Sequence, residues 1–353
     1  MAESGYAVDV QNLTKCFPVR QGFFRSRQKG SVLKAVNGVS FKLKRGESLG
    51  LAGESGCGKT TTGKILLKLY EPTSGKYLFN GKDVTNIKNG QELKEFRKRA
   101  QLVFQNPFEA LNPRFTVFRS IAEPLIIHNI GSKDERVDLV KQALERVHLQ
   151  PAETFLDKYP HQMSGGQLQR VVLARALVVD PVFVVADEPV SMLDVSVRAG
   201  VLNLMKEVAQ DMQLTAVYIS HDLSLIRYLC DYTAIMYLGQ IVEIGLTGKV
   251  LEKPEHPYTQ ALISAVPVPD PDFEGGEVKI GSHVPSPIDL PPGCLFQDRC
   301  PYVEPICRQV QPTLQEAEPG HSVRCHMVNG IASSLKGGGM PDEDRIRCTW
   351  NHG

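Results

Sequence analysis

The residues that most clearly carry chemistry form one short run after an apolar stretch. Residues 53–60 read Gly-Glu-Ser-Gly-Cys-Gly-Lys-Thr and fit the pattern G-x-x-x-x-G-K-[ST]. The glycines let backbone N–H groups turn inward around an anion, and the start of a following helix adds the positive end of its dipole. Lys59 would reach the outer phosphates of a nucleotide, and the Thr60 hydroxyl would ligate Mg²⁺. The run predicts a nucleotide site made of Gly53, Glu54, Ser55, Gly56, Cys57, Gly58, Lys59, Thr60 and Thr61.

A second run, residues 182–188, places two carboxylates at the end of an apolar strand. A phosphate-binding loop needs a carboxylate near its metal ion and a group that orients the attacking water. Asp187 is therefore the predicted Mg²⁺ carboxylate and Glu188 the predicted general base. Taken alone, the run could be any buried strand with a polar end, but the loop upstream favours the catalytic interpretation.

Four cysteines form a third candidate site. Cys294, Cys300, Cys307 and Cys325 are spaced C-x5-C-x6-C-x17-C. Four thiolates suit tetrahedral zinc or a cubane iron–sulfur cluster, and free or oxidised thiols are the third possibility. The segment shows little apolar periodicity, so we expect it to need such a staple in order to fold.

The elements that must position these groups follow from apolar patterning. Short β-branched runs at 48–52, 102–104, 182–186, 216–219 and 234–237 alternate with helical patterns and predict a sheet of the α/β class. Residues 8–13 and 32–43 alternate with period two, which favours a smaller antiparallel layer. Between these two lies a basic stretch, 20–30, which we interpret either as a solvated hairpin excursion or as a contact with lipid or a partner.

The chain divides by composition into four parts. Residues 1–265 form the predicted nucleotide-binding domain, with a helical part at about 106–180. Seven prolines exclude regular structure from 266–292 and predict a linker. A Cys-rich domain follows at 293–328, and 329–353 is a predicted flexible tail.

Composition excludes several classes. The 353 residues carry 40 Lys+Arg against 39 Asp+Glu, so no global basic field points to a nucleic-acid partner. An apolar content of 42% argues against a disordered chain. No apolar run reaches the length of a membrane helix, and residues 1–10 lack the pattern of a secretory signal. We therefore expect a cytoplasmic location.

Residues 163–170, Met-Ser-Gly-Gly-Gln-Leu-Gln-Arg, resemble the LSGGQ signature of ATP-binding cassette (ABC) proteins. Other elements of that family follow in order: Phe17 resembles the aromatic that stacks on adenine, Gln105 the Q-loop glutamine, Asp194 the D-loop aspartate and His221 the switch histidine. The resemblance implies an α/β fold with a RecA-like core, an antiparallel β subdomain and a helical subdomain, here followed by a small Cys-rich extension.

The same resemblance implies roles for the site residues. Two such domains enclose two ATP molecules head to tail, and Glu188 polarises the attacking water while His221 contacts the γ-phosphate. Thr60, Gln105 and Asp187 surround Mg²⁺. The signature residues of one subunit contact the ATP held by the other, and in this chain they are Ser164, Gly165, Gly166 and Gln167.

Residues 105–114 and 256–262 narrow the resemblance to the ATP-binding subunits of oligopeptide and dipeptide permeases, in particular the F-type subunit. This resemblance implies a second ABC ATPase as heterodimer partner, two membrane permease subunits and an extracytoplasmic substrate-binding protein. It also implies peripheral attachment to the cytoplasmic face of the membrane and a [4Fe–4S] cluster on the four cysteines. The rival interpretations are a nickel or oligosaccharide importer, a soluble ABC ATPase, and an iron–sulfur redox protein with a regulatory nucleotide domain.

Overall fold

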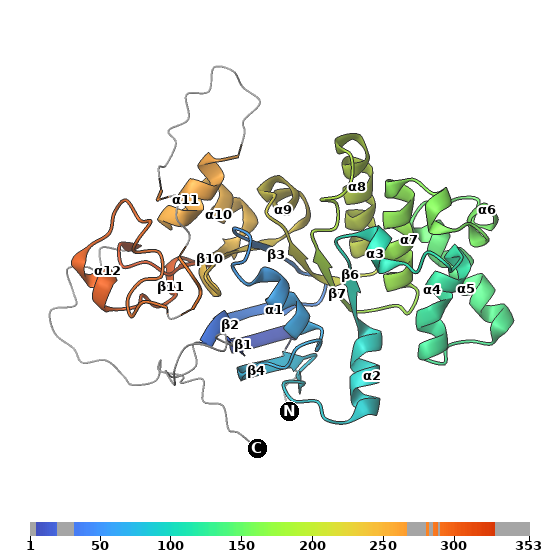
Figure 1. Ribbon diagram of the computed structural model, residues 1–353, viewed down its shortest axis with the longest axis horizontal. Coiled ribbons are helices and arrows are strands. Elements are labelled where there is room, and N and C mark those ends of the chain that lie inside the picture. The colour runs from blue at the N-terminus through green and yellow to red at the C-terminus, as the bar shows by residue number, and fades with distance from the viewer. Residues whose placement is uncertain (1–4, 20–31, 267–279, 282–284, 289, 329–353) are drawn as a thin grey trace, which may run out of the picture.

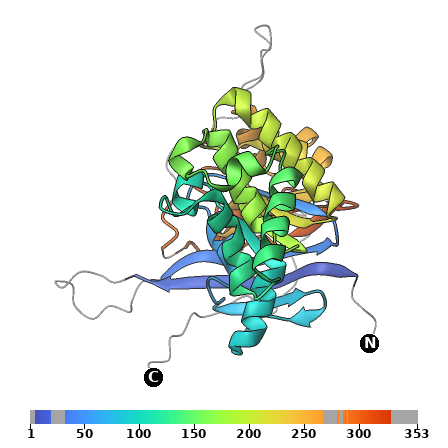
Figure 2. The same cartoon turned by 90° about the vertical axis from the view of Figure 1, so that its right-hand side faces the viewer.

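The computed structural model describes residues 5–19, 32–266, 280–281, 285–288 and 290–328, and the basic stretch 20–30 and the tail 329–353 lie outside this set. Two β-sheets, one of them flanked by a group of helices, make up the described part (Figures 1 and 2). The smaller sheet is antiparallel, with the order β2-β1-β4-β5. Its strands are β1 (Tyr6–Pro18), β2 (Val32–Lys44), β4 (Ser74–Phe79) and β5 (Lys82–Asp83).

The larger sheet has the order β11-β12-β10-β9-β3-β8-β7-β6, and its five strands from β9 to β6 are parallel. Its strands are β3 (Ser48–Ala52), β6 (Ala100–Val103), β7 (Phe183–Asp187), β8 (Thr215–Ile219), β9 (Tyr232–Tyr237), β10 (Gln240–Leu246), β11 (Gln315–Glu318) and β12 (His321–Val323). The strand predicted at 102–104 exists but begins earlier, at Ala100, which follows helix α2 (Gly90–Arg99) directly and already pairs with Phe183.

Alternation along β7 explains how the larger sheet is buried on both faces. Phe183 and Val185 belong to one apolar cluster, which joins both sheets through helix α1. Val184 and Ala186 belong to the other cluster, beneath the helices of the opposite face. Successive side chains of a strand point to opposite faces, so a continuous apolar run is what a doubly covered strand requires.

The helices frame the phosphate loop and the signature segment. The helices α3 to α7 lie within the predicted helical part and pack together at one end of the molecule, away from the smaller sheet (Figure 1). In chain order the helices are α1 (Lys59–Leu66), α2 (Gly90–Arg99), α3 (Pro107–Ala110), α4 (Val117–Ile127), α5 (Lys133–Arg146), α6 (Glu153–Leu156), η1 (Pro160–Gln162), α7 (Gly165–Leu177), α8 (Val195–Asp211), α9 (Leu223–Leu229), α10 (Thr247–Glu252), α11 (Pro257–Ser264) and α12 (Pro305–Gln309).

The Cys-rich segment is joined to the larger sheet. Strand β12 pairs antiparallel with β10, and β11 continues the sheet beyond it. Leu295 and Phe296 are buried in the apolar cluster that also holds the helices α7 and α9. The segment therefore folds against the nucleotide-binding part and shares its core. Among the described helices, none combines the length and apolar character that a bilayer crossing requires.

Candidate active site

The phosphate loop connects the end of β3 to the start of α1, and its backbone demands glycine. Gly53 has φ +144° and Gly58 has φ +107°. A Cβ on Gly58 would lie 2.2 Å from the carbonyl oxygen of Ala35, so a larger residue would both strain and displace the loop. The glycine spacing seen in the sequence is thus a requirement of this turn.

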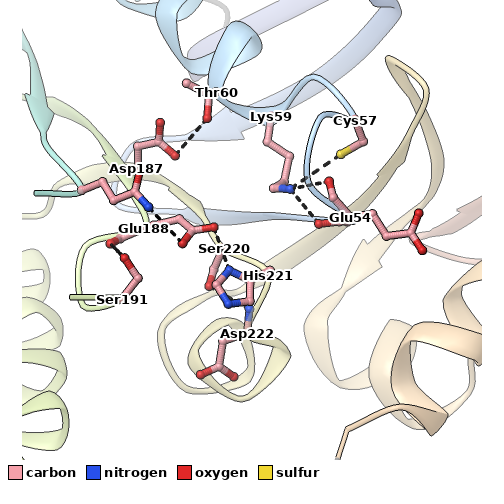
Figure 3. A network of polar contacts seen from close by, with 12 residues as sticks. Glu54, Cys57, Lys59, Thr60, Asp187, Glu188, Ser191, Ser220, His221 and Asp222 are labelled. Atoms are coloured by element: carbon pink, nitrogen blue, oxygen red, sulfur yellow. Dashed lines mark hydrogen bonds and ion pairs between the residues drawn. The ribbon is translucent and has the colours of Figure 1, made fainter. Parts of the chain in front are cut away.

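Lys59 and Thr60 present the loop's reactive side chains at the first turn of α1. The Lys59 side chain is buried, and its Nζ donates hydrogen bonds to the carbonyl oxygens of Gly53 at 2.7 Å and Glu54 at 2.9 Å. The Thr60 hydroxyl donates to Asp187 Oδ1 at 3.3 Å, across from β7 (Figure 3). The loop and the end of β7 therefore meet at the carboxyl edge of the sheet.

Glu188 lies directly after β7, and His221 follows β8 by two residues. The imidazole Nδ1 of His221 lies 2.7 Å from Glu188 Oε1, and Gln105 Nε2 donates to Glu188 Oε2 at 3.4 Å (Figure 3 shows the pair with His221). Glu188 has φ +45°, an uncommon conformation for a residue with a side chain, and its N–H donates to the Ile219 carbonyl oxygen at 2.8 Å. Backbone strain and a ladder hydrogen bond together fix where this carboxylate points.

The donor set beside Thr60 fits a magnesium ion. Thr60, Gln105 and Asp187 all line one cleft and offer hydroxyl, amide and carboxylate oxygens, the ligand type that Mg²⁺ prefers. Burial raises the pKa of Asp187, although the hydrogen bond from Thr60 partly offsets this. A cation at this point would stabilise the partly desolvated carboxylate.

The cleft has a volume of about 770 Å³ and brings together most of the predicted nucleotide and catalytic residues. The predicted residues that line it are Phe17, Ser55, Gly56, Gly58, Lys59, Thr60, Thr61, Gln105, Asp187, Glu188 and His221. The predicted loop residues Gly53, Glu54 and Cys57 are not among its lining residues, and burial raises the pKa of the Cys57 thiol. Sequence reasoning missed Leu33, Lys34, Ala35, Ile219, Gly239 and Pro287, which reach the cleft only through the fold.

The signature residues lie elsewhere on the chain. Ser164 is the N-cap of α7, where its hydroxyl accepts from the Gln167 N–H at 3.3 Å and the Gln167 side chain accepts from the Ser164 N–H. Neither this helix start nor Asp194, the N-cap of α8, is among the residues that line the cleft. Ser164 itself is exposed, whereas Gly166 is buried against Val197.

The four cysteines gather in the C-terminal extension. The Cys294 N–H donates to the Cys307 carbonyl oxygen at 2.7 Å, and burial together with the neighbouring thiols raises the pKa of Cys294 to about 12 and that of Cys325 to about 11. Within the described part of the chain, however, no three Cys, His, Asp or Glu side chains are arranged to hold a metal ion. The arrangement of these side chains therefore does not support the predicted four-thiolate cluster.

A glycine-bounded loop at a strand-to-helix turn, with a buried lysine and a carboxylate pair on a nearby strand, defines a P-loop nucleoside triphosphatase. The ABC transporter family model matches residues 36–191, and the model for the C-terminal region of oligopeptide/dipeptide transporters matches residues 242–307. The oligopeptide transport ATP-binding protein AppF of Bacillus subtilis is 47% identical over 91% of this chain and 97% of its own length. The dipeptide transport ATP-binding protein DppF of Haemophilus influenzae is 45% identical over 90% and 95%.

Solved structures agree with these matches. The ATP-binding cassette MJ0796, in a dimeric post-hydrolysis state with ADP and phosphate, is 28% identical with a TM-score of 0.58, covering 68% of this chain and 98% of that one. The protein cbiO1 of Clostridium perfringens, part of an ABC transporter complex, is 25% identical with a TM-score of 0.60 over 71% and 92%. This chain belongs to the family of ABC transporter ATPases that includes the oligopeptide and dipeptide transport ATP-binding proteins. The ABC ATPase fold and the family expected from the sequence are confirmed, and the separate Cys-rich extension stays a prediction.

Proposed function

We propose that this chain is the ATP-hydrolysing subunit that energises an importer of dipeptides or oligopeptides. The observation that carries the proposal is the assembly of Lys59, Thr60, Asp187, Glu188 and His221 around one cleft. The peptide cargo is supported by relatives of about the same length whose names specify oligopeptide and dipeptide transport.

ATP binding uses the loop and the walls of the cleft. Backbone N–H groups of the loop and the α1 N-terminus would hold the phosphates, and Lys59 would exchange its loop carbonyl partners for phosphate oxygens. Phe17 lines the cleft, where its ring would stack on the adenine. Thr60, Asp187 and Gln105 would hold Mg²⁺, which neutralises charge on the phosphates when bound.

Hydrolysis then depends on the orientation of one water molecule. Glu188 would accept a hydrogen bond from that water and polarise it for attack on the γ-phosphate. His221 lies 2.7 Å from the same carboxylate and would contact the γ-phosphate as well as the base. Gln105 reaches the other oxygen of Glu188, so the base is held from two sides.

Completion of the site requires a second ATPase subunit. The exposed start of α7 at Ser164 offers N–H groups and a helix dipole to an anion, which suits the γ-phosphate held by a partner. We propose that Ser164, Gly165, Gly166 and Gln167 fill this role, with Asp194 at the same interface, and that the partner is a related but different chain. ATP binding would close the pair, and hydrolysis would open it.

Membrane partners would dock near Gln105. A hollow of about 220 Å³ is lined by Leu111, Phe115, Glu123 and Arg175 among others, and Phe108, which shares helix α3 with the lining residue Ala110, is 59% exposed. A hollow that combines apolar side chains with one ion pair suits an amphipathic helix of a permease subunit. We propose two permease subunits and an extracytoplasmic binding protein, with this chain peripheral on the cytoplasmic face of the membrane.

The four cysteines are proposed as ligands of a [4Fe–4S] cluster after a local rearrangement. Support comes from their spacing and from their proximity, because the other three thiols contribute to the raised pKa of Cys294. Because no ligating arrangement is present among the described residues, no step of hydrolysis is assigned to a cluster. Iron and acid-labile sulfide measured on anaerobically purified protein test the proposal. Zinc instead of iron, or no metal at all, would reject it.

The transport proposal is tested by purifying the tagged chain from detergent-solubilised native membranes and identifying its partners by mass spectrometry. A second ATPase, two polytopic proteins and a binding protein for peptides are the expected set. A nickel- or oligosaccharide-binding protein would reassign the cargo. Ribosomal or DNA-repair partners would indicate a soluble ABC ATPase, and an electron-transfer protein would indicate the redox interpretation.

A further inference from the structure

An ion pair links the C-terminal extension to the phosphate loop across 245 residues of sequence. Arg299 Nη1 and Nη2 donate to the two carboxylate oxygens of Glu54 at 2.7 and 2.8 Å, a bidentate arrangement. The Arg299 side chain is only 5% exposed, and that of Glu54 is 29% exposed. Such a pair is held more firmly than an exposed surface pair, because little water competes with it.

The guanidinium is anchored on several sides. Its Nε donates to the Gly281 carbonyl oxygen at 2.7 Å, and its central carbon lies within 6 Å of the ring centres of Tyr237 and Phe296. The Arg299 N–H donates to the Phe296 carbonyl oxygen at 3.0 Å. A side chain with this many contacts has few accessible rotamers. The Arg299 guanidinium therefore moves together with the segment 294–300.

Glu54 is also held through its backbone. Its N–H donates to the Tyr258 hydroxyl at 2.9 Å, and its carbonyl oxygen accepts from Lys59 Nζ at 2.9 Å. One residue thus carries the contact with Arg299 on its side chain and the contact with the phosphate-binding lysine on its carbonyl. A displacement of Arg299 would therefore change the position of Lys59 through Glu54 alone.

We propose that Arg299 is a positioning residue for ATP binding, which couples the segment between Cys294 and Cys300 to the phosphate loop. The inference rests on the proposed nucleotide site at residues 53–61. Loss of order in the extension would release Glu54 and lower the affinity of the loop for phosphate. By reciprocity, nucleotide binding would order the extension.

The test compares variants of the full chain, purified anaerobically, by titration with a fluorescent ATP analogue. Arg299→Met should raise Kd about tenfold, because a charge-assisted bidentate pair is lost, and Arg299→Lys should give an intermediate value. Glu54→Gln removes the other partner of the ion pair. Because both changes break the same contact, the Kd of the double variant should not exceed the higher Kd of the two single variants. The matched control is Arg308→Met in the same extension, whose exposed side chain lies 3.8 Å from Asp298 and should leave Kd unchanged.

A second readout separates positioning from general stability. Hydrogen exchange in residues 290–301 should slow on adding the nucleotide in the natural chain and in Arg308→Met, but not in Arg299→Met. A Kd for Arg299→Met within twofold of the natural chain, even with a lower melting temperature, would overturn the inference. Lys59→Ala distinguishes the two proposals. If Lys59→Ala and Arg299→Met both bind the ATP analogue normally, the proposed nucleotide site is wrong. If Lys59→Ala loses binding and Arg299→Met does not, only the role of Arg299 is rejected.

Discussion

Two glutamate–histidine pairs in this chain have the same separation and opposite surroundings. Glu188 and His221 lie 2.7 Å apart with side chains 19% and 65% exposed, whereas Glu243 and His321 lie 2.7 Å apart and are 0% and 1% exposed. The first pair stands at the open edge of the sheet, where water and phosphate can reach it. The second joins β10 to β12 inside the protein. The same two functional groups thus serve different purposes according to their access to solvent.

Hydrogen bonding follows the same division. The Glu243 carboxylate accepts from the backbone N–H groups of Glu255 and His256 and is also paired with His321. These partners all belong to the protein, and burial keeps a substrate from reaching the carboxylate. The Glu188 carboxylate contacts the side chains of Gln105 and His221 and keeps acceptor capacity for a bound water. A buried pair that is fully satisfied stabilises the fold, while an exposed pair with spare acceptor capacity can do chemistry.

The largest effect is expected from Glu188→Gln. Turnover of ATP should fall by about 10²-fold to 10⁴-fold, because the amide is a far weaker base than the carboxylate. ATP affinity and the melting temperature should stay near the natural values. Steady-state hydrolysis and nucleotide titration measure the two quantities, and hydrolysis at the natural rate would contradict the assignment of the base.

Glu243→Ala should act on stability instead. Removing the carboxylate leaves two backbone N–H groups and the buried His321 imidazole without their partner, so we expect a loss of about 3–5 kcal/mol in the free energy of unfolding. Denaturant titration followed by circular dichroism measures this loss. The control is Glu316→Ala on strand β11 of the same sheet, whose exposed carboxylate accepts one N–H from Gly320. Equal losses in the two variants would show that burial does not distinguish these carboxylates.

The buried region should also be sensitive to acid through His256. Burial lowers the pKa of His256 from 6.5 to about 4, so its neutral form is favoured in the folded state. The unfolded chain binds this proton first as the pH falls, and roughly 3 kcal/mol of stability should be lost between pH 6.5 and 4. His256→Asn retains an acceptor for the Tyr258 N–H but does not titrate, so its stability should fall less over this range. Parallel curves of stability against pH for the two proteins would exclude His256 as the source of the acid sensitivity.

The smallest stability effect is expected from His221→Ala. Its imidazole is exposed, so the free energy of unfolding should change by less than about 0.5 kcal/mol while ATP turnover falls. His321→Ala serves as the opposite case, with a large loss of stability because a buried carboxylate loses its partner. Denaturant titration of the two alanine variants measures both losses of stability. Equal losses would contradict the distinction between the exposed and the buried pair.

Much of the active site could be predicted from the sequence, because the chemistry is carried by short contiguous runs. The glycines of the loop 53–60 specify its turn. Asp187 and Glu188 end a strand that its apolar run predicts from the local sequence alone. Parallel strands end at a common edge, which brings Thr60 to Asp187 and His221 to Glu188. The pattern along the chain therefore predicted the ATPase family and most of the residues that line the cleft.

The tertiary structure alone decided how the C-terminal extension meets the phosphate loop. The contact of Arg299 with Glu54 spans 245 positions, and nothing in the local sequence around either residue indicates it. Likewise, the sequence contains both glutamates and both histidines, but their burial depends on which strands pair and which helices cover them. Spacing determines which groups can meet within an element, whereas access to water is a property of the packed whole.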